Sequence, residues 1–218
     1  MEILGKLFGS EDKVKIMRLF LFNPERVYDK EEIANRAKSN PYVVKHELEI
    51  LEKIGLIKKK GPSKKAQANG NGSIPKLSGK GPKRIGWMLD SSFPYLPHLQ
   101  NVLINTVLLK DGEILNKLHS VGKLKLVITS GVFMQYWDAR VDLLVVGDSL
   151  RMGYLDSVIK TIEAEIGKEI RYAAFETSEF QYRLKMYDKL VRDIIDYPHS
   201  RILDRLNVGQ GNLGNKAF

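Results

Sequence analysis

The residues best suited to chemistry lie close together between Thr129 and Asp142. Ser130 and Gly131 follow an apolar run that predicts a strand, and a glycine turn of this kind lets backbone amides approach a phosphate. Arg140 and Asp142 stand at positions i and i+2 at the start of a second apolar run. Two carboxylates at this spacing would share one face of a strand and hold Mg²⁺. With arginine in the first position, we expect the cation to be repelled and Asp142 to accept a salt bridge from Arg140.

Composition and spacing exclude several other kinds of site. The chain has no cysteine, which rules out disulfides, thiolate metal sites and a cysteine nucleophile. The four histidines show no metal-ligand spacing: they are His46, His98, His119 and His199. Gly79-Lys80-Gly81 is not followed by a helix pattern, as a Walker-type loop would be, and Ser130 lacks the G-x-S-x-G pattern of a nucleophile elbow. We therefore expect no catalytic residues, no metal and no cofactor.

Positive charge is concentrated in one segment. The net charge is +9, and nine basic residues with no acidic one lie between Lys58 and Arg84, so the rest of the chain is formally neutral. Such a local field favours a polyanion, either a nucleic acid or an anionic membrane surface. The longest apolar runs are far shorter than the roughly 20 residues of a membrane span. Residues 1–10 also lack a signal-peptide core, so we expect a cytoplasmic protein without a membrane segment.

The first part of the chain predicts three helices and a hairpin. One helix is expected over residues 11–22, capped by Ser10, a second from Asp29, and a third after Asn40-Pro41. The third helix has an apolar stripe of Val44, Leu48, Leu51 and Ile54. Its opposite face carries Tyr42, Lys45, His46 and Glu49. Residues 56–58 and 84–89 predict two strands, and the Gly-, Lys- and Pro-rich stretch between them is expected to be flexible.

After a connector at residues 90–97, the second part alternates between helical and strand patterns. Helices are expected over 98–109, 112–119, 155–166 and 180–194, and strands over 123–129, 140–146 and 171–175. Short, fully apolar strands between helices argue for an α/β layered domain. The Gly- and Asn-rich residues 209–218 predict a flexible tail.

The stretch EEIANRAKSNPYVVKHELEILEKIGLIKKK resembles the second helix, turn, recognition helix and first wing strand of winged helix-turn-helix regulators. This resemblance implies that the N-terminal half of the third helix reaches base edges while the basic wing contacts phosphates or the minor groove. The implied DNA-binding residues are Asn40, Tyr42, Lys45, His46, Lys58, Lys59, Lys60, Lys64, Lys65, Lys83 and Arg84.

The stretch KLKLVITSGVFMQYWDARVDLLVVGD resembles the signature of minimal nucleotidyltransferases. The resemblance implies a small sheet flanked by helices, but the order of Ser130 and Gly131 is reversed and Arg140 replaces the first metal-binding acid. Residues 171–175 contain no third acid, and Glu176 is a candidate only at the strand end. The positions Ser130, Gly131, Arg140 and Asp142 are thus expected to form a degenerate nucleotide site, with a nucleotide or another anion as its candidate ligand.

The fold class expected is α/β (α+β), with a winged helix-turn-helix over residues 1–90, whose wing at about 60–83 is flexible, and a nucleotidyltransferase-like domain over 91–208. The leading hypothesis is a transcriptional regulator that binds duplex DNA, with the second domain serving for dimerisation or ligand sensing. A homodimer is expected because one small recognition helix seldom supplies enough affinity. Two alternatives stay open: an active Mg²⁺-dependent nucleotidyltransferase targeted by its winged helix, and a nonspecific nucleic-acid-binding protein.

Overall fold

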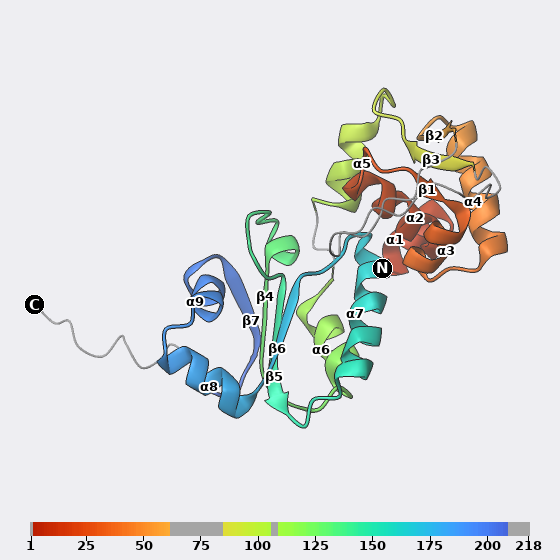
Figure 1. Cartoon of the computed structure of the whole chain (residues 1–218). Coiled ribbons are helices and arrows are strands. Elements are labelled where there is room, and N and C mark those ends of the chain that lie inside the picture. The colour runs from red at the N-terminus through yellow and green to blue at the C-terminus, as the bar shows by residue number, and fades with distance from the viewer. Residues whose placement is uncertain (1, 62–84, 106–108, 209–218) are drawn as a thin grey trace, which may run out of the picture. The chain divides into compact units, whose positions relative to one another are not determined.

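The computed structural model describes residues 2–61, 85–105 and 109–208 and divides into two compact units, Met1–Ile104 and Asn105–Phe218. Both units mix helices with a small sheet (Figure 1), so the expected α+β class is confirmed at that level. The boundary lies after Ile104 and not at residue 90 as expected. The reason is that Leu103 is buried in the core of the first unit, where its carbonyl accepts a hydrogen bond from Arg18 Nε at 2.9 Å.

The helices described in the first unit are α1 (Glu2–Phe8), α2 (Glu11–Phe22), α3 (Lys30–Ala37), α4 (Pro41–Lys53) and α5 (Leu96–Leu103). Three of them, α2, α3 and α4, begin where their capping residues predict. Ser10 Oγ accepts from the amide of Lys13 at 3.2 Å, and Asp29 Oδ1 accepts from that of Glu32 at 2.8 Å. These bonds satisfy amides that lack a partner inside the first turn. Helix α1 has no counterpart among the expected elements.

The sheet of the first unit holds three antiparallel strands within the described residues, in the order β1-β3-β2. They are β1 (Tyr28–Asp29), β2 (Ile57–Lys60) and β3 (Gly86–Leu89). Ile57 faces Leu89 and Lys60 faces Gly86, which confirms the expected hairpin. Strand β1, only two residues long, pairs with the other side of β3 and was not expected.

The core of the first unit surrounds α2, which is buried on every side from residue 16 to residue 21, and the other helices pack around it. Val44, Leu48 and Leu51 of α4 are buried as predicted, beside Phe20 from α2. Ile54 departs from the expected stripe, since its side chain is 54% exposed. It is the C-cap of α4, where the chain turns into the left-handed Gly55, so the helical periodicity no longer applies to it.

The second unit alternates helices and strands and adds one unexpected strand. Its helices are α6 (Asp111–Leu118), α7 (Met152–Ile166), α8 (Thr177–Lys185), α9 (Lys189–Asp196) and the 3-10 helix η1 (Gly131–Met134). Its strands are β4 (Lys123–Ser130), β5 (Leu143–Asp148), β6 (Tyr172–Glu176) and β7 (His199–Asp204), in the order β6-β5-β4-β7. Strands β5 and β6 are parallel, while β4 is antiparallel to both β5 and β7.

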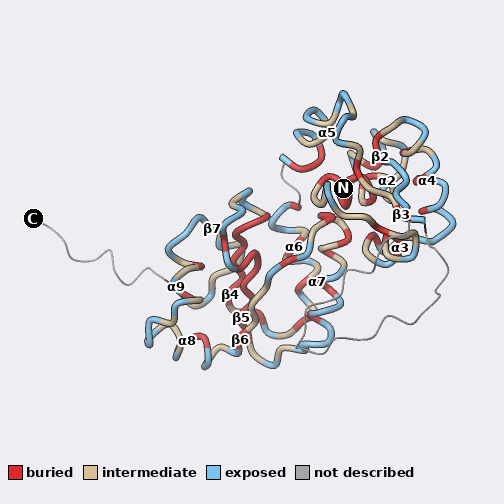
Figure 2. Tube along the Cα trace, turned by 45° about the horizontal axis from the view of Figure 1, so that its top comes forward, coloured by how far each residue is buried: buried red, intermediate tan, exposed pale blue. Residues whose placement is uncertain are grey.

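This sheet lies between two helical layers. Helices α8 and α9 lie on one side of it and α6 and α7 on the other (Figure 1). Leu126 and Ile128 of β4 pack with Phe180, Val191 and Ile194 of the first layer. Because both faces are covered, β4 and β5 are buried along most of their length (Figure 2).

The helix expected over residues 180–194 is two helices. Tyr187 adopts the left-handed conformation with φ +55°, which ends the first helix. Asp188 then caps α9, because its Oδ1 accepts from the amides of Leu190 and Val191 at 2.9 and 3.2 Å. A side chain that bonds local amides in this way competes with continuation of the helix.

In the parts of the chain that the structure describes, no helix is both long and apolar enough to cross a membrane.

Candidate functional site

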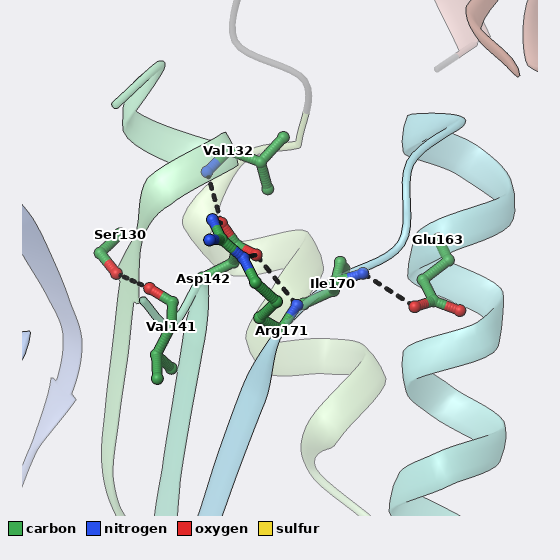
Figure 3. A network of polar contacts seen from close by, with 7 residues as sticks. All are labelled: Ser130, Val132, Val141, Asp142, Glu163, Ile170 and Arg171. Carbon is green, nitrogen blue, oxygen red and sulfur yellow. Dashed lines mark hydrogen bonds and ion pairs between the residues drawn. The ribbon is translucent and has the colours of Figure 1, made fainter. Parts of the chain in front are cut away.

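Asp142 is the centre of a buried polar network between the ends of β4, β5 and β6 (Figure 3). Its side chain is only 1% exposed. The main chain here is fixed on both sides, since the amide of Ser130 donates to the Asp142 carbonyl at 2.9 Å and the Asp142 amide donates to the Arg171 carbonyl at 2.6 Å. Ser130 Oγ also donates to the carbonyl of Val141. Three strand ends therefore hold the carboxylate in one position.

Four hydrogen bonds converge on the Asp142 carboxylate. Oδ1 accepts from the Val132 amide at 2.9 Å and from Arg171 Nη2 at 3.1 Å. Oδ2 accepts from the Arg171 amide at 2.9 Å and from Arg171 Nε at 3.0 Å. The four hydrogen bonds equal the number of lone-pair positions on a carboxylate. The hydrogen bonds to Asp142 raise the pKa of Arg171 above its usual value. The arrangement is a bidentate ion pair, and a metal would have to displace it.

Gly131 is required by the same carboxylate. It adopts the left-handed conformation with φ +53°, and a Cβ atom there would lie 1.9 Å from Asp142 Oδ1. Gly131 is the first residue of η1, and the amide of the next residue, Val132, donates to Asp142. The sequence predicted a turn whose amides approach a phosphate. In the structure, the partner of the Val132 amide is the Asp142 carboxylate of the same chain.

Arg140 does not pair with Asp142 as expected. Its Nε lies 3.0 Å from Asp193 Oδ2 on α9, and its side chain is exposed. Strand β5 begins only at Leu143, so the two-residue alternation of a strand does not govern residues 140 and 142. Arg171, just before β6, supplies the guanidinium instead, and nothing in the local sequence distinguished it.

Glu176, the expected strand-end candidate for a third acid, lies at the other end of the sheet. In the parallel pairing Leu143 is opposite Tyr172 while Gly147 is opposite Glu176. The carboxylate of Glu176 accepts from the amides of Ser149 and Leu150 at 3.2 and 3.1 Å. Within residues 2–61, 85–105 and 109–208, no group of three His, Cys, Asp or Glu side chains is placed to hold a metal ion.

Lys168 and Trp137 border the Asp142 network, and the sequence did not indicate either. Lys168 Nζ lies 4.4 Å from the centre of the Trp137 ring. Partial burial lowers the pKa of Lys168, the attraction of Asp142 opposes that shift, and repulsion by Arg171 adds to it. Two cations thus act on one carboxylate, with an exposed aromatic ring beside them.

The polar face of α4 is presented to solvent. Tyr42 is 85% exposed, and Lys45 and His46 are exposed beside it. Lys45 Nζ lies 3.9 Å from Glu49 Oε1, a loose pair between two exposed side chains. Asn40 has a structural role as well, since its Oδ1 caps α4 by accepting from the Tyr42 amide at 2.9 Å.

Two of the expected wing lysines have partners within their own unit. Lys58 Nζ lies 3.1 Å from Asp90 Oδ1, and Lys59 Nζ lies 2.8 Å from Glu52 Oε1. Hydrogen bonds lower the pKa of both acids: those from Ser92 contribute most at Asp90, and that from Lys59 contributes most at Glu52. Lys60 is exposed on the same strand. The remaining expected contacts, Lys64, Lys65, Lys83 and Arg84, lie outside the described residues, as do most of the wing and the tail at 209–218.

No protein-family model matches this chain, and no curated protein or solved structure matches it either.

Proposed function

We propose that this protein is a DNA-binding transcriptional regulator, with a winged helix in its first unit and a nucleotidyltransferase-like module without a metal site in its second. The observation that carries the proposal is the exposed polar face of α4, whose other face is fixed in the core by Val44, Leu48 and Leu51. The element order α2-β1-α3-α4-β2-β3, with the sheet order β1-β3-β2, also supports a winged helix. In that fold α4 is the recognition helix.

The residues proposed to read bases are Tyr42, Lys45 and His46, in the first half of α4. A lysine reaches the O6 and N7 acceptors of guanine in the major groove, and an exposed aromatic ring can pack on a thymine methyl group. Glu49 competes only weakly for Lys45, because an exposed pair of this kind contributes about 1 kcal/mol or less.

The lysines of β2 are proposed to contact phosphates. The ion pairs of Lys58 with Asp90 and of Lys59 with Glu52 are both solvent-accessible, so a phosphate can replace either carboxylate at small cost. Each phosphate contact releases condensed counterions, which makes binding depend on salt.

The first test is a selection of bound fragments from a random duplex DNA pool at about 150 mM salt, a concentration at which nonspecific binding is weak. With the recovered site, Lys45→Ala is expected to weaken binding by about 1–3 kcal/mol and to relax base preference. The matched control is Lys160→Ala, which removes the same charge from an exposed position on α7. Equal losses in the two variants, or none in Lys45→Ala, would refute α4 as the recognition helix.

The same purified protein and DNA also distinguish the regulator from the nonspecific nucleic-acid-binding alternative. It predicts equal affinity for unrelated sequences and a steep salt dependence. Replacing Lys58, Lys59 and Lys60 with glutamine is expected to flatten the slope of log affinity against log salt, without changing base preference. The expected change is roughly 0.9 for each phosphate that the variant no longer neutralises. If the slope is unchanged, β2 does not contact the DNA backbone.

The proposal for the second unit rests on the Asp142 network. The antiparallel pairing of β4 and β5, which are joined through the glycine turn, supports the resemblance to a nucleotidyltransferase. Arg171 comes directly before β6, the strand that would carry the third metal ligand in that family. A permanently charged guanidinium bound to Asp142 opposes Mg²⁺ binding there. Two cations, Lys168 and Arg171, act at this position, and we propose an anion as its ligand instead.

The competing hypothesis, an active transferase, has a direct test. Mg²⁺-dependent transfer of label from a nucleoside triphosphate, abolished by Asp142→Ala but not by Asp138→Ala at an exposed neighbouring position, would refute the proposed inactivity. Without such transfer, titration of inorganic phosphate followed by Trp137 fluorescence tests the anion site.

A further inference from the structure

A charged residue interrupts the apolar stripe of α4. Glu47 lies on the same side of the helix as Val44 and Leu48, and it is only 5% exposed. Its Oε2 atom is buried and has no hydrogen-bond partner in the described part of the chain. Taking a carboxylate out of water costs free energy that an apolar side chain at the same position would not cost. The stability of the core therefore gives no reason for a glutamate here.

The charge that balances Glu47 comes from the first turn of α2. Lys13 Nζ lies 3.4 Å from Glu47 Oε2, and the two side chains are 20% and 6% exposed. Lys13 Nζ also donates to the carbonyl of Phe8, at the end of α1, at 3.3 Å. One ammonium group thus connects three helices, α1, α2 and α4.

A second contact from the same turn of α2 holds the start of α4. Ser39 Oγ donates to Asp12 Oδ1 at 2.6 Å, although the two residues are 27 positions apart. Ser39 directly precedes Asn40, the N-cap of α4. Two consecutive residues of α2 therefore hold α4 at its start and at its middle, and we call these two contacts the α2–α4 tethers.

The tethers supply a direction that the apolar contacts of α4 lack. The hydrophobic effect is non-directional, so burial of Val44, Leu48 and Leu51 fixes the rotation and tilt of the helix only loosely. An ion pair and a hydrogen bond act between particular atoms and weaken when those atoms move apart. In some proteins a buried polar pair specifies one arrangement of the helices at a cost in stability.

We infer that Asp12 and Lys13 are positioning residues for the proposed recognition helix. Through Ser39 and Glu47 they hold the exposed face of α4 in the orientation that reads bases. The inference rests on the proposed function, because the orientation of α4 has a readout only if that helix docks on DNA. Hydrogen bonds to base edges weaken steeply when donor and acceptor are misaligned, so a small rotation of α4 lowers base discrimination.

The test replaces the buried ion pair with apolar side chains of similar size, in the double variant Lys13→Met/Glu47→Leu. The net charge is unchanged, so the slope of log affinity against log salt is expected to equal that of the wild type. The thermal midpoint is expected to stay the same or to rise. Base discrimination is the affinity for the selected site relative to a site with one altered base pair. It is expected to fall roughly tenfold, which is the size of a typical mismatch penalty.

The matched control is Lys117→Met/Glu165→Leu in the second unit. It removes a Lys–Glu pair between α6 and α7 whose atoms are 2.7 Å apart and whose side chains are 28% and 16% exposed, and it is expected to leave base discrimination unchanged. Lys13→Arg keeps a cation beside Glu47 and is expected to retain discrimination. Ser39→Ala removes the other tether from a partly exposed position and is expected to lower discrimination, so it decides the question if Lys13→Met/Glu47→Leu does not fold.

Two results would overturn the inference. One is wild-type discrimination in both Lys13→Met/Glu47→Leu and Ser39→Ala. The other is a loss of discrimination that appears only together with a lower thermal midpoint, because that result assigns the tethers to stability alone.

A measurement without DNA separates this inference from the proposed function. The amide NMR signals of α4 are expected to broaden or multiply in Lys13→Met/Glu47→Leu, because the helix then samples several orientations, and to stay as in the wild type in Lys117→Met/Glu165→Leu. If the signals change in a protein that binds no duplex DNA, the regulator is refuted and the tethers remain. If a specific site is bound and neither the signals nor the discrimination change, the tethers are refuted and the regulator remains.

Discussion

Replacement of Asp142 by asparagine tests whether this carboxylate is structural or functional. A structural carboxylate stabilises the fold, so its loss lowers the free energy of unfolding, whereas loss of a functional one leaves that free energy unchanged or raises it. Asparagine keeps the shape, but only one of its two terminal atoms accepts hydrogen bonds. Of the four donors on Asp142, the two that face the new amide nitrogen lose their acceptor. A lost hydrogen bond of this kind costs about 1–3 kcal/mol, and the half-exposed Arg171 recovers part of its share from water. We therefore expect Asp142→Asn to lower the free energy of unfolding of the second unit by about 2–4 kcal/mol.

The measurement is urea unfolding at pH 7 in a Trp87→Phe background. The chain has two tryptophans, so Trp137 then reports on the second unit alone. Asp138→Asn at an exposed position is the matched control and is expected to change stability by less than about 0.5 kcal/mol. An acid held ready for a metal is usually a cost to stability, and its neutralisation usually stabilises the fold. If Asp142→Asn is as stable as the wild type or more so, the structural assignment of Asp142 is refuted.

Two further predictions concern the same unit. Gly131→Ala is expected to destabilise this unit by about 3 kcal/mol or more, because the new methyl group collides with Asp142 and the positive φ is strained. The same urea titration measures the loss, and wild-type stability would contradict the geometry of this turn. The hydrogen bond from Tyr172 to Asp156 raises the pKa of Tyr172 to about 12. Since the folded-state pKa lies above the unfolded value, this bond stabilises the protein below pH 10 and the contribution is lost as pH rises toward 12. An absorbance titration at alkaline pH is expected to show one late tyrosine that Tyr172→Phe removes.

Local signals in the sequence predicted α2, α3 and α4 of the first unit well. Ser10, Asp29 and Asn40 each cap the helix that follows them, because a capping bond involves only residues two or three positions apart. The buried stripe of α4 likewise follows from a periodicity within one helix. The hairpin of β2 and β3 was also predicted from two short runs, although residues 61–85 separate its two strands.

The unpredicted features depend on partners distant in the chain. Strand β1 has two residues and exists through pairing with β3, and β7 exists through pairing with β4. The apolar spacing across Tyr187 continued as if one helix ran through it, whereas the cap at Asp188 divides it into two. At the candidate site we expected Ser130, Gly131 and Asp142 to lie together, as they do, but we expected Arg140 and not Arg171 to pair with Asp142. Arg171 lies 29 residues beyond Asp142, and only the parallel pairing of β5 with β6 brings the two together.

The bond between Arg18 and Leu103 has a consequence for synthesis of the chain. The two residues are 85 positions apart, so at 5–20 residues per second α2 leaves the ribosome roughly 4–17 s before its last partner is made. During that interval the Arg18 guanidinium, almost fully buried in the finished unit, remains in water or in temporary contacts. The basic segment between Lys58 and Arg84 is completed within the same interval, before the first unit can close. The core of the first unit is therefore complete only once α5 has emerged, and a chain stalled between Lys58 and Arg84 carries its positive charge before that core is complete.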